Sequence, residues 1–139
     1  MANKEKLIEE VFHKNTQIAL IIRNEFQTEP NSIKFFTPNT FSQQIGLMQR
    51  PKGYKIQPHI HKRVKREVLY TNEVLLVKKG LIQVDFYDDN KKFITSKIIK
   101  NGDILLLIKG GHGFNILEES EIYEIKQGPY VGEADKLRF

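Results

Sequence analysis

The sequence predicts an all-β sandwich or barrel with at most one short helix, near the N-terminus. Short runs of β-branched and aromatic residues are separated by turn signals every eight to twelve residues or so, and helix-period patterning is nearly absent. The 139 residues are enough for one compact domain. We therefore expect a single domain over residues 1–139, with the barrel core at about 45–127 and an irregular tail at 128–139.

The first part of the chain predicts a short helical turn followed by four strands. Residues 1–10 contain KEKLIEE, which is rich in helix-forming residues. The segments VFHKN and QIALIIRN follow as two strands around a turn near Asn15-Thr16, and the Pro, Asn and Ser of residues 27–32 predict a loop. Two further strands are expected at IKFFT and SQQIGLMQR, and the second stops at the turn Pro51-Lys52-Gly53.

The second part predicts strands that alternate with tight turns. The segment YKIQPHIH is expected as a strand, although Pro58 favours an edge or a bulge. After a basic, polar stretch, EVLLVKK leads to a turn at Gly80 and to the alternating strand LIQVDFY. The remaining expected elements are a hairpin loop at Asp88–Lys91, the strand FITSKII, a turn at Lys100–Asp103, the buried strand DILLLI, the segment GGHGFNIL, a turn at Glu118–Ser120 and the strand EIYEIKQ.

The composition excludes several classes of chemistry. The chain has no cysteine, so disulfides, thiolate nucleophiles and cysteine-bound zinc are excluded, and a metal would be held by nitrogen and oxygen. The charged N-terminus has no signal-peptide pattern, and no apolar run is long enough to cross a bilayer. A cytoplasmic location is expected. The net charge of +5 is spread among interspersed acids and bases, without the pattern of a nucleic-acid-binding protein.

Three of the four histidines are candidate metal ligands. His59 and His61 form H-I-H, and on a strand such residues share one face about 6.5 to 7 Å apart, although two exposed side chains beside a loop explain the pattern equally well. Glu73 opens the apolar strand that begins EVLLV and needs a partner there. Three glycines around His112 allow a close approach to a ligand, the alternative being a plain Gly-rich hairpin. His13 is expected to be structural or exposed.

These residues stand at spacings that resemble the cupin superfamily. Its first motif is G-x5-H-x-H-x3,4-E-x6-G, and the chain has Gly53-x5-His59-x-His61 followed by Glu73-x6-Gly80. Its second motif is G-x5-P-x-G-x2-H-x3-N, and the chain has Gly102-x7-Gly110-x-His112 and then Asn115. The resemblance covers about residues 45–127 and implies a double-stranded β-helix, also called a jelly-roll barrel.

The chain departs from these motifs at two places. Eleven residues separate His61 from Glu73 in place of three or four, so that the loop between the strands is longer. Glu67 is a rival carboxylate because its gap of five is nearer the motif, but only Glu73 keeps the x6-Gly spacing. In the second motif Ile108 replaces the proline, and the histidine and asparagine arrive early.

The resemblance implies a metal held by His59, His61, Glu73 and His112, with one or two positions open for water or substrate. Nitrogen and oxygen ligands suit Fe, Mn, Ni, Cu or Zn without choosing among them. One interpretation is a metal-binding cupin that binds or converts a small polar molecule, sugar-derived or anionic. If it is an enzyme, an isomerase, an epimerase or an oxygenase is expected. The alternatives are a non-catalytic binding or sensing barrel, and a sugar-nucleotide ketoisomerase that uses the histidines as acid and base without metal.

Ligand-binding residues are expected around the barrel mouth. The basic cluster Lys62, Arg63, Lys65 and Arg66 is either a solvated loop or a site for an anionic ligand. Arg63 and Arg66 would then bind phosphate by bidentate hydrogen bonds. The other candidates are Tyr54, Gln57, Tyr70 and Gln83. A general base could come from Asp103 or Glu124, although turn and surface roles are favoured for both. A homodimer is expected from the apolar surface of the early strands.

Overall fold

The computed structural model describes residues 6–139, which divide into two compact units. We call residues up to Phe26 together with Tyr70–Phe139 the sheet unit, and Gln27–Leu69 the loop unit. The described residues form strands and one short 3-10 helix, in the order β1 (Ile8–His13), β2 (Thr16–Ile22), β3 (Ser32–Phe35), β4 (Gly46–Gln49), β5 (Glu73–Tyr87), β6 (Phe93–Lys100), β7 (Ile104–Leu107), β8 (Gly111–Lys126) and η1 (Gly132–Asp135).

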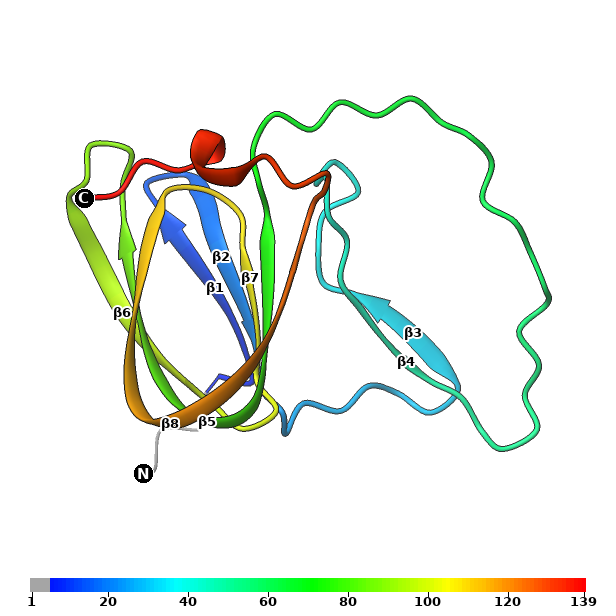
Figure 1. Cartoon of the computed structure of the whole chain (residues 1–139). Coiled ribbons are helices and arrows are strands. Elements are labelled where there is room, and N and C mark those ends of the chain that lie inside the picture. The colour runs from blue at the N-terminus through cyan, green and yellow to red at the C-terminus, as the bar shows by residue number, and fades with distance from the viewer. Residues whose placement is uncertain (1–5) are drawn as a thin grey trace. The chain divides into compact units, whose positions relative to one another are not determined.

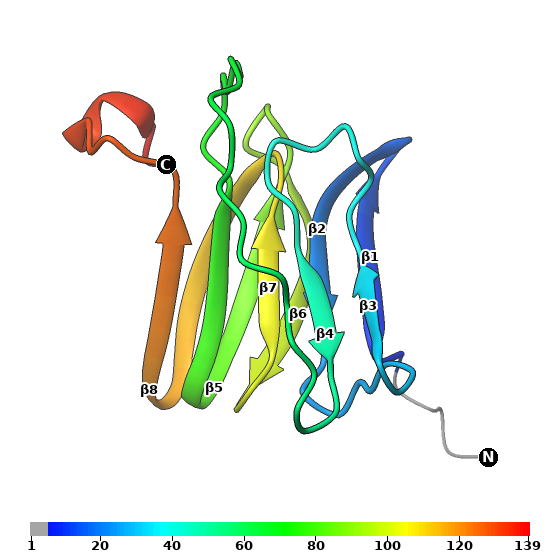
Figure 2. The same cartoon turned by 90° about the vertical axis from the view of Figure 1, so that its right-hand side faces the viewer.

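The sheet unit is a strongly curled, fully antiparallel half-barrel. Its strand order is β1-β2-β7-β5-β6, and β8 pairs with β5. Figure 2 shows β8, β5, β7, β2 and β1 following one another across the unit. One edge of β5 pairs with β8 along its length, while the other pairs first with β7 and then with β6. The all-β prediction is therefore confirmed at this level.

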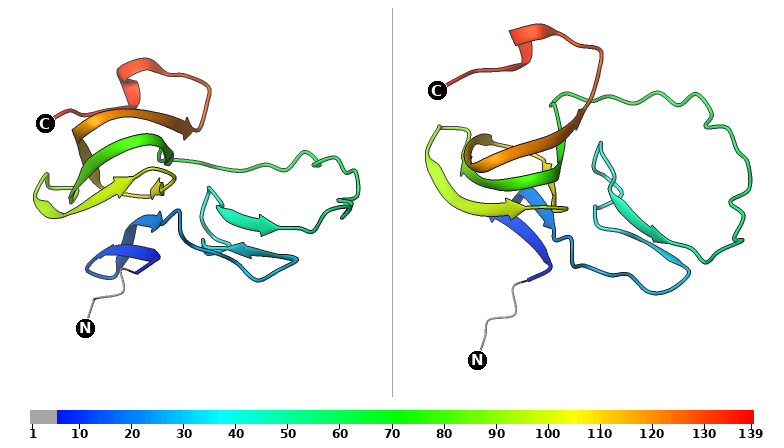
Figure 3. Two further views of the ribbon diagram at one scale, coloured as in Figure 1. Left: turned by 90° about the horizontal axis from the view of Figure 1, so that it is seen from below. Right: turned by 60° about the horizontal axis from the view of Figure 1, so that its bottom comes forward.

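Gly80 is the point at which β5 bends. Its φ of 122° lies in the region that favours glycine, and a Cβ there would fall 2.0 Å from Ser120 Oγ and 2.7 Å from Ser120 Cα. The pairing of β5 with β8 shifts register three times between Val77 and Ile82, so both strands bend together. Figure 1 shows the two strands as nested U-shaped ribbons, and Figure 3 shows them side by side throughout their course.

The core of the sheet unit lies inside this curl. Alternate residues of β5 after the bend, Ile82, Val84 and Phe86, are buried, as the period of two predicts. They pack with residues of the other strands, including Val11, Ile18, Ala19, Ile21, Leu75, Val77, Ile99, Leu105 and Leu107. The apolar side chains of β2 are thus used within the unit, which removes β2 from the basis of the dimer expectation.

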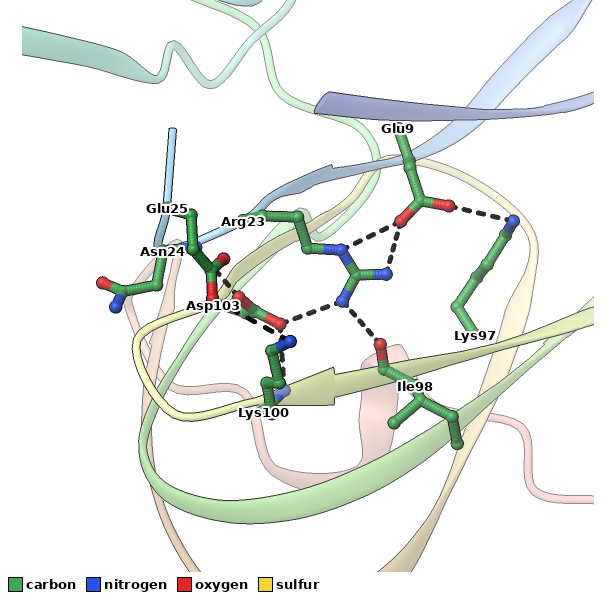
Figure 4. A network of polar contacts seen from close by, with 8 residues as sticks. All are labelled: Glu9, Arg23, Asn24, Glu25, Lys97, Ile98, Lys100 and Asp103. Carbon is green, nitrogen blue, oxygen red and sulfur yellow. Dashed lines mark hydrogen bonds and ion pairs between the residues drawn. The ribbon is translucent and has the colours of Figure 1, made fainter. Parts of the chain in front are cut away.

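An ionic network joins strands that share no backbone pairing. Arg23 follows β2 and donates from Nε to Glu9 of β1 at 3.0 Å and from Nη1 to Asp103 at 2.9 Å and to the Ile98 carbonyl of β6 at 2.6 Å. Lys97 of β6 donates to the other Glu9 oxygen at 3.1 Å. Figure 4 shows Arg23 between the two carboxylates. The network therefore ties β1 to β6 by side chains.

Several expected elements are corrected by the structure. Ile8–Glu10, expected to be part of a helical turn, begin strand β1, while residues 1–5 lie outside the described residues. The segments EVLLVKK and LIQVDFY form one bent strand, because Gly80 curves the chain without reversing it. The turn at Glu118–Ser120 is likewise a bend within β8. The one short helix described is η1, near the C-terminus.

The loop unit consists of the antiparallel hairpin β3–β4 and a long extended segment. Ser32 pairs with Gln49 and Phe35 with Gly46. Residues 54–61, expected as a strand, form neither helix nor strand. Pro58 has no N–H to offer a ladder, which weakens the pairing of this segment. Across residues 6–139, the structure contains no helix of the length and apolar character needed to span a membrane.

Candidate functional site

The bend of β5 brings Glu73 and His112 together. Glu73 is paired with Lys126 at one end of β5, and His112 is paired with Phe86 near the other end. A straight strand of 15 residues would hold its ends more than about 40 Å apart. In the bent strand, Nε2 of His112 lies 3.3 Å from Oε2 of Glu73. The contact between Glu73 and His112 therefore depends on the curl of the sheet.

The environment of Glu73 favours its ionised form. Its side chain is 12% exposed and that of His112 is 31% exposed. The hydrogen bond from His112 lowers the pKa of the Glu73 carboxyl, against the opposing effect of burial, and the charges of Lys126 and Lys136 lower it further. An ionised carboxylate beside an imidazole can hold a divalent cation or act as an acid–base pair.

The pair lines an open pocket of about 840 Å³ within the sheet unit. A smaller adjoining pocket of about 470 Å³ shares Glu73 and His112 and is also lined by Glu124. The larger pocket is lined by Tyr70, Thr71, Glu73, Tyr87, Asp89, by residues 107–114 and by residues 135–139. The β7–β8 turn and the C-terminal segment thus form much of its wall.

The glycines before His112 let the β7–β8 turn lie against its neighbours. Gly110 has a φ of 79°, and a Cβ there would fall 2.6 Å from the Tyr87 carbonyl oxygen. A Cβ on Gly111 would fall 2.9 Å from the ring of Phe139. The glycines therefore serve close approach to this chain's own atoms, at the edge of the pocket.

The other two predicted metal ligands lie in the loop unit. The rings of His59 and His61 have centroids 5.2 Å apart and are nearly perpendicular. Nδ1 of His59 lies 2.9 Å from the carbonyl oxygen of Gln57. Because the carbonyl can only accept, Nδ1 is the donor, and Nε2 keeps its lone pair. The four predicted ligands thus form two pairs, one in each unit, and within neither unit do three or more His, Asp or Glu of residues 6–139 cluster as a metal site.

The predicted ligand-binding residues also divide between the units. Tyr70 lines the pocket of the sheet unit, and Lys109 Nζ stands 5.8 Å from its ring centroid. Gln83 lies on the β5 face opposite Ile82 and Val84 and donates to Asp85 at 2.8 Å. The loop unit holds the others, all exposed: Tyr54, Gln57, Arg63, Arg66 and the rival carboxylate Glu67.

The two candidate bases have different surroundings. Asp103 is fully buried and accepts hydrogen bonds from Arg23 and from the backbone N–H groups of Asn24 and Lys100, so its role is structural. Glu124 lines the smaller pocket. Sequence reasoning missed Lys109, Lys136 and Phe139, which also line the larger pocket. Residues 128–139 show neither strand alternation nor helical spacing, so no periodic signal marks them.

Comparison of the chain with protein-family models, with curated proteins and with solved structures gives no match. The functional argument therefore rests on the chemistry of the side chains in each unit. A curled half-barrel supports many functions, and its fold does not choose among them.

Proposed function

We propose that the chain is a small metal-binding cupin-like protein that holds a sugar-derived or anionic small molecule. His59, His61, Glu73 and His112 would hold a divalent ion of Fe, Mn, Ni, Cu or Zn in a double-stranded β-helix, acting in the cytoplasm. The observation that carries the proposal is the Glu73–His112 pair, whose members come from different strands and lie 3.3 Å apart at an open pocket. A largely buried carboxylate with an imidazole is a suitable donor set for these ions.

The geometry of His59 supports the proposal independently. Metal-binding histidines commonly donate their second ring N–H to a carbonyl or carboxylate, which fixes the tautomer and the direction of the ring. The contact between Nδ1 of His59 and the Gln57 carbonyl has this form and leaves Nε2 available. The neighbouring ring of His61 offers a second imidazole nitrogen within reach of the same ion.

A bound ion with open positions would supply Lewis-acid polarisation of a substrate oxygen. The chain's own contribution is to orient the ligand and to exclude part of the solvent. Glu73 and His112, 3.3 Å apart, would both supply ligand atoms to the ion. The open pocket beside the pair offers space for a small polar molecule.

The test is divalent-ion binding by four proteins: wild type, His61→Ala, Glu73→Gln and Glu67→Gln. We expect metal in the purified wild type by elemental analysis and a higher melting temperature with added Ni²⁺ or Zn²⁺. Glu73→Gln and His61→Ala should weaken binding at least about 100-fold, more than loss of an outer-shell partner. Glu67→Gln is the matched control and should bind as wild type does. Affinity should fall in acid, because protons compete for imidazole nitrogen.

The Glu73–His112 contact also favours a second candidate, acid–base chemistry without metal. A carboxylate that orients an imidazole is a common arrangement for proton transfer. A sugar-nucleotide ketoisomerase would use such histidines. In that case wild type would show no bound metal and no stabilisation by any divalent ion, which would contradict the metal proposal. A loss of metal confined to Glu67→Gln would move the carboxylate ligand to that residue.

A further inference from the structure

The C-terminal residues Asp135–Phe139, which we call the strap, line the pocket. One end is held by Thr71, whose hydroxyl donates to Asp135 at 3.1 Å. At the other end the ring of Phe139 packs edge-to-face on Tyr87, with centroids 5.2 Å apart, and lies against Gly111. Figure 1 shows the C-terminal segment crossing from the end of β8 to the opposite side of the curl.

Two lysines line this pocket. Lys109 comes from the β7–β8 turn and Lys136 from the strap. Neither forms an ion pair with any part of the chain that the structure describes, residues 6–139, whereas Arg138 of the strap is paired with Glu133. Of the acids in the lining, Glu73 contacts His112 and is near enough to Lys136 for that charge to lower its pKa, while Asp135 accepts from Thr71. The third acid, Asp89, belongs to the β5–β6 turn.

We propose that Lys109 and Lys136 form a subsite for a phosphate group of the ligand, closed by the strap. The inference deepens the proposed function, since it assigns the charged end of the ligand whose other end would meet the Glu73–His112 pair. Two ammonium groups match the charge of about −1.5 to −2 on a phosphomonoester at neutral pH. Lysines bind phosphate as point charges, as the lysine of phosphate-binding loops does.

The position of Lys136 on the strap couples ligand binding to the strap. Phe139 is the anchor of the strap, through its ring contact with Tyr87. Releasing Phe139 should therefore weaken phosphate binding even though both lysines remain. A loss of affinity on releasing Phe139 would distinguish a lysine held in position from a nonspecific cationic surface.

The test is a calorimetric titration of metal-stripped protein with inorganic pyrophosphate, repeated at several salt concentrations. Lys109→Gln and Lys136→Gln should each lower affinity about tenfold, as expected for loss of one charge-assisted contact. The double variant should lose about 100-fold and show a weaker salt dependence. Phe139→Ala should also lower affinity. The matched control is Lys79→Gln, at the exposed bend of β5 and in neither pocket, which should bind as wild type does.

Three results would overturn the inference: no pyrophosphate binding by wild type, equal binding by the double variant, or an equal loss in Lys79→Gln. Succinate bound as tightly as pyrophosphate would overturn the assignment to phosphate. Nickel titration of the same variants keeps the two proposals distinct, since Lys109→Gln and Lys136→Gln should keep the affinity of wild type for nickel. A protein that binds pyrophosphate as expected but no metal would contradict the proposed function alone.

Discussion

Arg23 is the residue on which the buried charges of the sheet unit depend. Its side chain is 12% exposed and contacts two carboxylates, one of which, Asp103, is fully buried. Burial opposes the charge of Arg23, but hydrogen bonds to Asp103 and Glu9 raise its pKa. Burial likewise acts to raise the pKa of Glu9, and the hydrogen bonds from Arg23 and Lys97 overcome it and lower that pKa.

Replacing Arg23 by methionine should destabilise the protein by about 3–5 kcal/mol, because Asp103 would be left as an uncompensated buried charge. The measurement is the free energy of unfolding from urea denaturation. Arg138→Met is the control, since that arginine pairs with Glu133 at the exposed surface and its loss should leave stability nearly unchanged. Equal effects of the two substitutions would contradict this role.

The pH dependence of unfolding provides a second readout of the same network. The pKa of Glu9 is lowered from its usual 4.5, so its contribution to stability is complete above that pH. The contribution is lost as the pH falls through the lower pKa of the folded state. Wild type should therefore lose stability more steeply than Arg23→Met below about pH 4.5.

At the residue scale, the sequence predicted the chemistry of single side chains better than their partners. A carboxylate that opens an apolar strand predicts a partner for Glu73, and the structure gives it His112. The contact itself depends on the curl, which no spacing in the sequence expresses. No local pattern marks Arg23, because its partners Glu9 and Asp103 stand 14 and 80 residues away along the chain.

At the element scale, the bend of β5 depends on one residue without a side chain. The sequence predicted a turn at Gly80, since glycine permits a positive φ. The φ of 122° confirms the special conformation, but the chain continues as the same strand because β8 pairs with it on both sides of the bend. A glycine signals which conformations are allowed, while the partner strand decides whether the chain reverses.

Gly80→Ala should therefore destabilise the protein by at least about 2 kcal/mol, from backbone strain together with the clash on Ser120. Thermal or urea denaturation measures the effect. Gly53→Ala is the matched control, because Gly53 has a φ of 84° but nothing within 4 Å of a Cβ. Gly53→Ala should introduce the backbone strain without the clash, so it should lose less stability than Gly80→Ala. A larger loss at Gly53 would contradict the proposed packing at the bend.

Residues 54–61 show the limit of local patterns for predicting strands. The segment YKIQPHIH has the residues of a strand, yet a strand exists only if a neighbour supplies hydrogen bonds. In the structure the segment is exposed and unpaired, while the apolar strand after it, β5, has partners on both edges. The segments predicted for β2, β6 and β7 agree with the observed strands to within two residues at each end.

At the scale of the whole molecule, the predicted all-β class is confirmed. The double-stranded β-helix and the cupin resemblance stay predictions. The single domain over residues 1–139 stays a prediction. The described chain divides into two compact units with their own strands. A homodimer also stays a prediction. The exposed apolar surface that supports a dimer is now that of β3, where Ile33 and Phe35 are exposed, because β2 is buried in the core of its own unit. Light scattering would decide between the monomer of 16.2 kDa and a species of twice that mass.

The position of β5 between three partner strands has a consequence for the order in which the protein opens. Each amide hydrogen exchanges with solvent only when its own hydrogen bond breaks, and β5 is bonded to β8 on one edge and to β7 and β6 on the other. Its amides should therefore be the slowest to exchange deuterium, with rates set by global unfolding. The amides of β1 and β3, which each have a single partner strand, should exchange earlier through local fraying. Amide exchange followed by NMR would reveal this hierarchy, and faster exchange in Leu75–Val77 than in β1 would contradict it.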